Sequence, residues 1–234
     1  MRNAHGVTKD FEAALCEYTG APYAVAVNSC TMALTLAVAW HLRGKKPYCE
    51  VCGWQPVIGE QYECARSLCG WMNISPPISI PNRTYVSVPM AIIHAGGRPT
   101  FHDEDWRGCY QLTPLPVWDC ARWFTSSMYY AWMKGNHQMQ CVSFHASKTL
   151  GDTQGGAILH DNAEADAWFR RARFDGRAEG VAPKDDTGLI LGWHCYLSPD
   201  VSARLLNKLH FLPRHNEPLP NDDYPDLSTL ECFR

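Results

Sequence analysis

The stretch SFHASKTLGDTQGG, residues Ser143–Gly156, places one lysine, Lys148, among small and polar residues. An apolar run precedes this stretch, and a glycine pair ends it. A lysine that follows a strand can form an imine with an aldehyde, although most lysines are solvated and take no part in chemistry. The role of Lys148 therefore has to be decided from the rest of the chain.

The composition is that of a globular protein. The 234 residues are 46% hydrophobic and 19% charged, which is enough to bury a full core in one large domain, with or without an appendage. The formal charge of -3 provides no overall attraction to nucleic acid or to an anionic membrane. A local basic patch at Arg170, Arg171 and Arg173 leaves nucleic acid possible as a partner but unsupported.

We expect a cytoplasmic protein without a membrane segment. The N-terminal residues MRNAHGVTKDFEAAL contain no signal-peptide apolar stretch. No apolar run approaches the ~20 residues that a membrane span requires. The eleven cysteines are an odd number, which favours reduced thiols, some of them bound to metal, over a secreted disulfide set.

Helical and strand patterns alternate along the chain. Apolar spacing predicts helices at 9–19, 30–42, 84–97, 163–174 and 198–212, and short apolar runs predict strands at 23–29, 78–82, 99–105, 114–120, 141–145 and 156–161. This alternation predicts an α/β fold with a mostly parallel sheet sandwiched by helices. Ligands of such sheets bind at the carboxyl ends of strands, where Asn28, Asp119 and residues 143–148 fall.

A Cys-rich insert at residues 45–77 interrupts this alternation. Cys49-x2-Cys52 has the spacing of a zinc knuckle, and Cys64-x4-Cys69 supplies a second, less regular pair. We expect these four thiols to hold a structural zinc ion. The alternative is a small apolar cluster of ordinary thiols and the aromatic residues Tyr48, Trp54, Tyr62 and Trp71.

Three further features point to one ligand, although each has an ordinary explanation. The turn from Asn28 to Thr31 opens a helix and offers N–H groups to a phosphate, but such residues also serve as simple caps. Asp119 ends a strand, where its carboxylate could hold a pyridine nitrogen protonated or could merely cap a helix. Tyr85 begins a helix, where its ring could stack on a flat cofactor or pack as an ordinary tyrosine.

Five segments, in chain order, resemble the motif series of the DegT/StrS family of sugar aminotransferases, which use pyridoxal 5'-phosphate (PLP). They are NSCTMAL, PNRTYVSVPMAIIHAGGRPTFHDED, PVWDCAR, SFHASKTLGDTQGGAIL and GWHCYLSPDVSARL. The resemblance extends from Phe11 to about Pro213 apart from the insert, and SFHxxKxLGxxxGG is its most specific element. It implies the aspartate aminotransferase fold, fold type I. In that fold a large α/β domain binds PLP, and a second subunit completes each site of a homodimer.

The resemblance also assigns roles to individual residues. Lys148 falls on the lysine that forms the imine with PLP, and Asp119 falls on the acid that pairs with the pyridine nitrogen. Tyr85 matches the aromatic residue that stacks on the ring. The positions that match the phosphate-binding donors of the family are Cys30, Thr31, Met32 and Ser143.

Two positions depart from the family pattern. His194 stands where the family usually has an asparagine that reaches the phosphate bound by the neighbouring subunit. Arg122 stands where the family often has a glutamine near the cofactor, so contacts to the ring hydroxyl are expected to differ. His145 precedes Lys148 by three residues, and it either lines the pocket or is an ordinary histidine at a strand end.

The domain organisation follows from the same comparison. Residues 1–212 are expected to form the PLP-binding large domain, interrupted by the insert at 45–77, and residues 213–234 an extended tail. The C-terminal small domain of the family is expected to be absent. Fewer residues than in the family join the strands predicted at 99–105 and 114–120, which predicts a smaller sheet.

The predicted function is a PLP-dependent aminotransferase that moves an amino group from an amino acid to a nucleotide-linked keto sugar or a related carbonyl. Two alternatives remain open. The first is a PLP-dependent decarboxylase or amine-forming enzyme acting on an amino-acid-modified nucleotide or nucleobase, because the cofactor machinery is common to these reactions. The second is a non-catalytic binding protein that retains the fold.

Overall fold

A five-stranded sheet forms the centre of the fold. The computed structural model describes residues 5–43, 77–129, 137–221 and 223–233. The strands are β1 (Tyr23–Val27), β2 (Pro77–Pro81), β3 (Arg98–His102), β4 (Tyr110–Gln111), β5 (Val117–Asp119), β6 (Met139–Ser143) and β7 (Gly156–His160). The sheet has the order β1-β7-β6-β5-β4, while β2 and β3 form a separate parallel pair.

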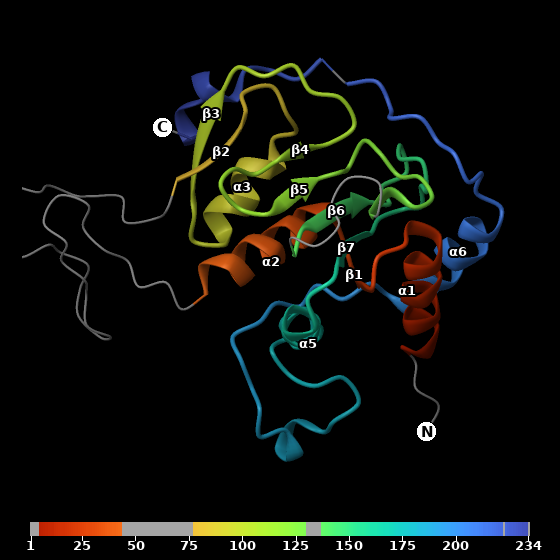
Figure 1. Cartoon of the computed structure of the whole chain (residues 1–234). Helices are drawn as coiled ribbons and strands as arrows, with labels where there is room; N and C mark the ends of the chain where they lie inside the picture. Colours follow the sequence, from red (N-terminus) through yellow and green to blue (C-terminus); the bar gives the residue numbers. More distant parts are fainter. Residues whose placement is uncertain (1–4, 44–76, 130–136, 222, 234) are drawn as a thin grey trace, which may run out of the picture.

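Five α-helices surround these strands within the described part of the chain (Figure 1). They are α1 (Gly6–Thr19), α2 (Cys30–Leu42), α3 (Ser87–His94), α5 (Ala163–Ala172) and α6 (Pro199–His210). Short 3-10 helices occur at η1 (Pro183–Asp185), η2 (Leu227–Thr229) and η3 (Glu231–Phe233). These helices and strands confirm the sequence-based expectation of an α/β fold.

The main sheet is mixed, so the prediction of a mostly parallel sheet is wrong. Among its described strands, β5 and β6 are the one parallel pair; the β1–β7, β6–β7 and β4–β5 pairs are antiparallel. Residues 144–155 join β6 to β7, and residues 112–116 join β4 to β5, without a helix. Two neighbouring parallel strands must be joined by a long crossover connection, which is usually an α-helix. These helix-free connections therefore join antiparallel strands.

Helices cover both faces of the sheet, as predicted. In β1, Val25 and Val27 belong to a core that also contains residues of α2, α3 and α5. The alternate residues Ala24 and Ala26 belong to a second core with α1 and α6. A strand buried on both faces has no polar side, which explains the apolar runs of β1 and of residues 156–159 in β7.

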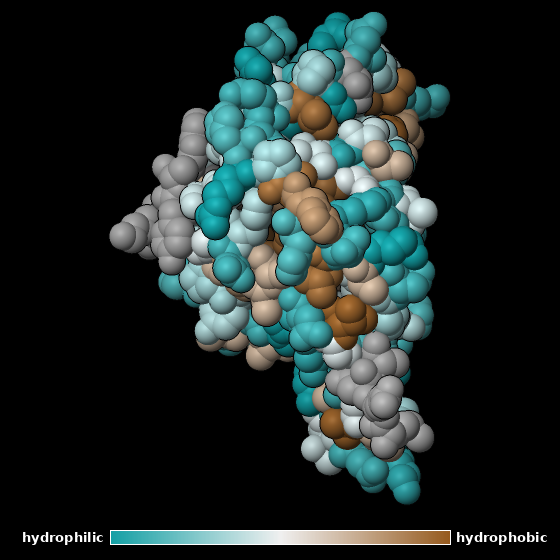
Figure 2. All heavy atoms as spheres, turned by 90° about the vertical axis from the view of Figure 1, so that its right-hand side faces the viewer, coloured by the Kyte–Doolittle hydropathy of each residue, from teal (hydrophilic) through white to brown (hydrophobic). Residues whose placement is uncertain are grey.

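The outer surface of α1 and α6 is polar. Val201, Leu205 and Leu209 of α6 are buried, whereas the side chain of Arg204 is nearly half exposed. Figure 2 shows this side of the molecule, where hydrophilic atoms predominate and apolar atoms occupy small areas. None of the helices in the described ranges combines the length and apolar character needed to cross a bilayer.

The three arginines at the end of α5 and directly after it are paired with carboxylates and do not form a free basic patch. Arg170 binds Glu12 at 2.7 Å, Arg171 binds Asp186 at 3.0 Å, and the buried Arg173 also binds Glu12. These pairs neutralise the positive charge that the sequence suggested as a possible nucleic-acid contact.

Gly156 allows β7 to pass close to the beginning of α2. A Cβ atom at this position would lie 2.5 Å from the Cys30 nitrogen and 2.6 Å from the Ser29 carbonyl carbon. Its neighbour Gly155 has a φ of +133°, a conformation that residues with a side chain rarely adopt. The glycine pair after Lys148 therefore brings the strand β7 against the first residues of α2.

Gly156→Ala is expected to lower the free energy of unfolding by about 1–3 kcal/mol, because the new methyl group must displace backbone atoms. Urea denaturation measures the change. Gly6→Ala is the matched control, since a Cβ there meets nothing within 4 Å. Equal effects of the two substitutions would contradict this account of the glycine pair.

Candidate active site

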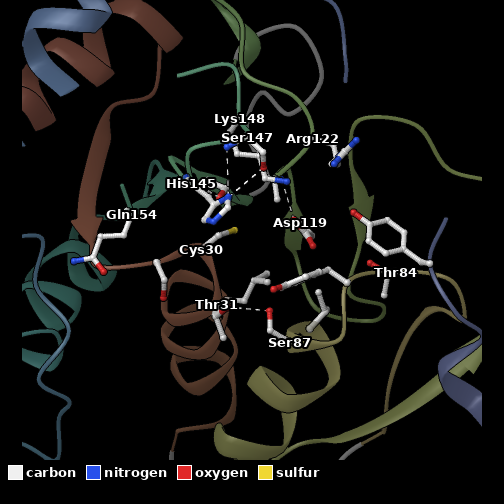
Figure 3. Close-up of a pocket in the computed structure, with 18 of the residues that line it drawn as sticks. Cys30, Thr31, Thr84, Ser87, Asp119, Arg122, His145, Ser147, Lys148 and Gln154 are labelled. Carbon is white, nitrogen blue, oxygen red and sulfur yellow. Dashed lines mark hydrogen bonds between the residues drawn. The ribbon is translucent and has the colours of Figure 1, made fainter. Parts of the chain in front are cut away.

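The carboxyl ends of β1, β5 and β6 lie at one edge of the sheet. Because two antiparallel pairings separate β1 from β6, these three strands point in the same direction. The segments that follow them enclose a cavity of about 250 Å³ (Figure 3). The predicted cofactor residues that line it are Cys30, Thr31, Tyr85, Asp119, Arg122, Ser143 and Lys148.

Asp119 is the buried acid of this cavity. It is the register partner of Tyr110 on β4, whose hydroxyl donates a hydrogen bond to Asp119 Oδ2 at 2.9 Å. The Ala121 N–H donates to Oδ1 at 2.9 Å, and the Thr84 hydroxyl lies 2.6 Å from the Tyr110 hydroxyl. Burial raises the pKa of Asp119, while these two donors and the charge of Lys148 act in the opposite direction. The fold thus holds a carboxyl in a fixed orientation at a site with little water.

Lys148 lies in a tightly closed loop. Its N–H donates to the His145 carbonyl at 2.8 Å, and the Asp152 N–H donates to the Phe144 carbonyl at 2.9 Å. Gly151 is required inside this loop, because a Cβ there would lie 2.8 Å from the Lys148 carbonyl oxygen. Figure 3 shows Lys148 and Asp119 on the wall of the same cavity.

Asp152 fastens the lysine loop to α6. Its buried carboxylate accepts hydrogen bonds from Arg204 at 2.9 Å and from Lys208 at 2.7 Å. The Arg204 guanidinium, together with Lys208, holds the pKa of Asp152 well below its usual range. The backbone around Lys148 is therefore fixed by a charged anchor on a separate helix.

The first turns of α2 and α3 meet at the floor of the cavity. The Thr31 hydroxyl donates to Ser87 Oγ at 2.8 Å (Figure 3), and Ser29 Oγ caps α2 by accepting from the Met32 N–H at 3.2 Å. A helix N-terminus carries partial positive charge. With two hydroxyl groups beside it, this corner has the donors that a phosphate needs.

Two of the predicted phosphate residues do not line the cavity. Met32 packs against the core, and its N–H is already used by Ser29. His194 is exposed, and its Nδ1 lies 3.0 Å from Asp175 Oδ2. The contact of His194 with a neighbouring subunit stays a prediction. His145 does line the cavity, with its Nδ1 3.1 Å from Ser147 Oγ.

Several cavity residues were not predicted from the sequence. Ser87 could have been found, because it lies in the first turn of the helix predicted at 84–97, two residues after Tyr85. Trp106 and Tyr224 also line the cavity, and their rings are stacked at 6.3 Å. Nothing in the proline-rich, polar sequence around Tyr224 points to a pocket residue, because its role depends on where the chain returns in space.

Comparison with known proteins identifies the fold. The family model of the DegT/DnrJ/EryC1/StrS aminotransferase family matches residues 4–51. The resemblance to this family is confirmed. No curated protein sequence matches the chain.

Solved structures extend the likeness over most of the chain. A DegT DnrJ EryC1 StrS aminotransferase from Brucella abortus is 19% identical, with a TM-score of 0.58, over 88% of this chain and 59% of that one. The sugar aminotransferase CalS13 from Micromonospora echinospora is 16% identical, with a TM-score of 0.62, over 88% and 61%. NtdA from Bacillus subtilis with bound cofactor PMP is 16% identical, with a TM-score of 0.60, over 88% and 48%. The chain has the DegT-type aminotransferase fold and spans less than two thirds of the length of each of these structures.

The predicted zinc ligands cannot be placed on this fold. Cys49, Cys52, Cys64 and Cys69 lie outside the described residues. Within the described ranges, no group of three or more histidine, cysteine or acidic side chains could hold a metal ion. The zinc site stays a prediction from the spacing of the cysteines.

Asp119→Asn is expected to raise the Tm of the cofactor-free protein at neutral pH. The pKa of Asp119 is higher in the folded than in the unfolded protein, so its carboxylate destabilises the fold as pH rises above the unfolded value. Below that value the residue is protonated in both states, and the difference between the two proteins should disappear. Thermal unfolding at acidic and neutral pH measures this dependence.

Asp226→Asn provides a control of opposite sign. Hydrogen bonds, first that from Ser228, lower the pKa of Asp226, so its carboxylate stabilises the fold above the unfolded pKa and loses that effect as pH falls through the folded value. This substitution is expected to lower the Tm at neutral pH. A lower Tm for Asp119→Asn as well would show that burial of the Asp119 carboxylate is not unfavourable.

Proposed function

We propose that this protein is a PLP-dependent aminotransferase, which moves an amino group from an amino acid donor to a nucleotide-linked keto sugar or a related carbonyl. The observation that carries the proposal is the placement of Lys148 and Asp119 on one cavity wall beside the start of α2. An amine, a buried acid and an anion seat are the three groups that a phosphorylated pyridine aldehyde requires.

The residues of the cavity fit PLP. Thr31 and Ser87 would hold its phosphate at the N-terminus of α2, and Asp119 would face its ring nitrogen. Tyr85, which is 59% exposed at the cavity wall, offers a ring face to its aromatic system. When bound, PLP supplies an electron sink for the bonds broken at the donor's Cα atom.

Asp119 and Lys148 divide the acid–base work. Asp119 would hold a proton on the ring nitrogen, because a carboxylate removed from water favours a charged hydrogen-bond partner. Lys148 would hold PLP through its amine, which can condense with an aldehyde with loss of water, and the same amine would move a proton at the donor's Cα. The neighbours Ala146 and Ser147 are small, which leaves the lysine side chain room for both positions.

Arg122 extends the set of polar groups around the cofactor. It lines the cavity with only 7% of its surface exposed, and its backbone carbonyl accepts the Leu219 N–H at 2.8 Å. A buried guanidinium favours an oxygen anion, such as the ring hydroxyl of the cofactor. Ser143, at the carboxyl end of the neighbouring strand β6, adds a hydroxyl group to the cavity.

We further propose a homodimer in which each site is completed by the partner. The apolar side chains of Val86, Met90 and Ile93 are exposed on α3 and just before it, close in sequence to Tyr85 at the cavity. They support this proposal because exposed apolar side chains that lie together mark interaction surfaces. His194 would act across the interface.

The remaining features of the proposal concern the domains, the compartment and the insert. Residues 1–212 form the large domain, and residues 213–234 form its tail. The protein is cytoplasmic, and the insert at 45–77 binds structural zinc.

Incubation of the purified protein with PLP is expected to give a visible absorbance and, after borohydride reduction, a covalent adduct at Lys148 found by peptide mass spectrometry. Lys148→Ala should abolish both signals. Lys184→Ala is the matched control, because this lysine lies on η1, away from the cavity, and it should leave both unchanged.

The reaction type is tested on the same sample. With a panel of amino acids the wild-type protein should release the keto acid of the preferred donor, and release of carbon dioxide would favour a decarboxylase instead. A wild-type protein that binds no PLP, or an adduct that persists in Lys148→Ala, would contradict the proposal.

A further inference from the structure

The C-terminal residues form an ordered strap. We use the term strap for residues 213–221 and 223–233, which follow α6. Figure 1 shows this segment, in blue, passing over one side of the molecule to reach β3. At its beginning the Ser126 N–H donates to the Arg214 carbonyl at 2.9 Å, and the Asn216 N–H donates to the Thr125 hydroxyl at 3.0 Å.

The middle of the strap follows the wall of the cavity. The Leu219 N–H donates to the carbonyl of Arg122, a cavity residue, at 2.8 Å. Asn221 donates from its side chain to the Trp106 carbonyl. Pro218 packs so closely on Gly108 that a Cβ at Gly108 would lie 3.0 Å from the proline ring.

The far end is anchored in the fold beside β2 and β3. Leu227 is fully buried, and its N–H donates to the Asn82 carbonyl at 2.8 Å. The Asn82 side chain donates to Asp226 Oδ2 at 3.2 Å. Phe233 packs against Phe101 with ring centroids 6.1 Å apart. The strap is therefore fixed on both sides of the cavity.

Tyr224 lies between these two anchors and reaches the cavity. Its backbone carbonyl accepts a hydrogen bond from Arg83 at 3.2 Å. Its ring is nearly parallel to that of Trp106, with 14° between the two planes, and both side chains line the cavity. An aromatic side chain held by its own backbone and by a stacked neighbour loses little further freedom when a ligand binds.

We propose that the strap is a wall of the ligand site and that Tyr224 is a binding residue for PLP, which it retains by covering the bound cofactor. This inference rests on the proposed function, since it takes PLP as the ligand. Tyr224 and Trp106 together offer apolar area that excludes water from a bound aromatic ring. The strap residues thus supply, from the same chain, one wall of a cavity that the ends of β1, β5 and β6 also line.

The experiment compares PLP dissociation constants, measured by titration of visible absorbance, for the wild type and three variants. Tyr224→Ala is expected to bind PLP about 10-fold more weakly, which corresponds to the loss of one partly buried aromatic contact. Tyr224→Phe keeps the ring and should stay within about 2-fold of the wild type. Phe233→Ala is the matched control, because it alters a strap aromatic that does not line the cavity, and it should also stay within that range.

Amide hydrogen exchange gives a second readout that does not depend on activity. PLP should slow exchange at Leu219 and Leu227, two strap amides that donate to backbone carbonyls of the protein body, in the wild type and much less in Tyr224→Ala. The Arg173 amide, bonded to the Phe169 carbonyl in α5, should not respond. Thermal unfolding establishes that each variant is folded.

The outcomes separate this inference from the proposed function. If the wild type binds PLP at Lys148 but Tyr224→Ala binds it equally tightly, the strap has no role in binding and the proposed function stands. Unchanged exchange at Leu219 and Leu227 on addition of PLP overturns the inference in the same way. A wild-type protein that does not bind PLP overturns both.

Discussion

The burial of one carboxyl, Asp119, at the end of β5 is the constraint on which the site depends. Burial makes its ionised form unfavourable, and the fold compensates with donors rather than with water. The antiparallel pairing of β4 with β5 sets Tyr110 directly opposite, and Thr84, just before α3, fixes the Tyr110 hydroxyl. The antiparallel direction of β4, the residue Thr84 before α3 and the charge of Lys148 therefore all influence the carboxyl group of Asp119.

The second constraint is the close contact between β7 and the beginning of α2. Gly156 allows this contact, which brings Cys30 and Thr31 to the same edge of the sheet as Asp119. The loop that carries Lys148 lies between β6 and β7 and is tied to α6 through Asp152. The stretch from Ser143 to Gly156 thus carries Lys148 and, through Gly156, places the beginning of α2 at the same cavity.

The grouping of the candidate site residues could be predicted although the strand directions could not. Apolar runs such as YAVAV at β1 report burial on both faces, and such burial does not distinguish parallel from antiparallel neighbours. The predicted residues lie together at one edge because β1, β5 and β6 share one direction in the mixed sheet. Tyr224 could not be predicted, since its place on the cavity results from a strap that returns past Trp106, more than a hundred residues earlier in the chain.

The central claim is that Asp119 holds a proton on the ring nitrogen of PLP. The nitrogen-15 chemical shift of labelled PLP, bound to the wild type and to Asp119→Asn at neutral pH, reports that proton directly. We expect a protonated ring nitrogen in the wild type and an unprotonated one in the variant. The same protonation state in both proteins would contradict it.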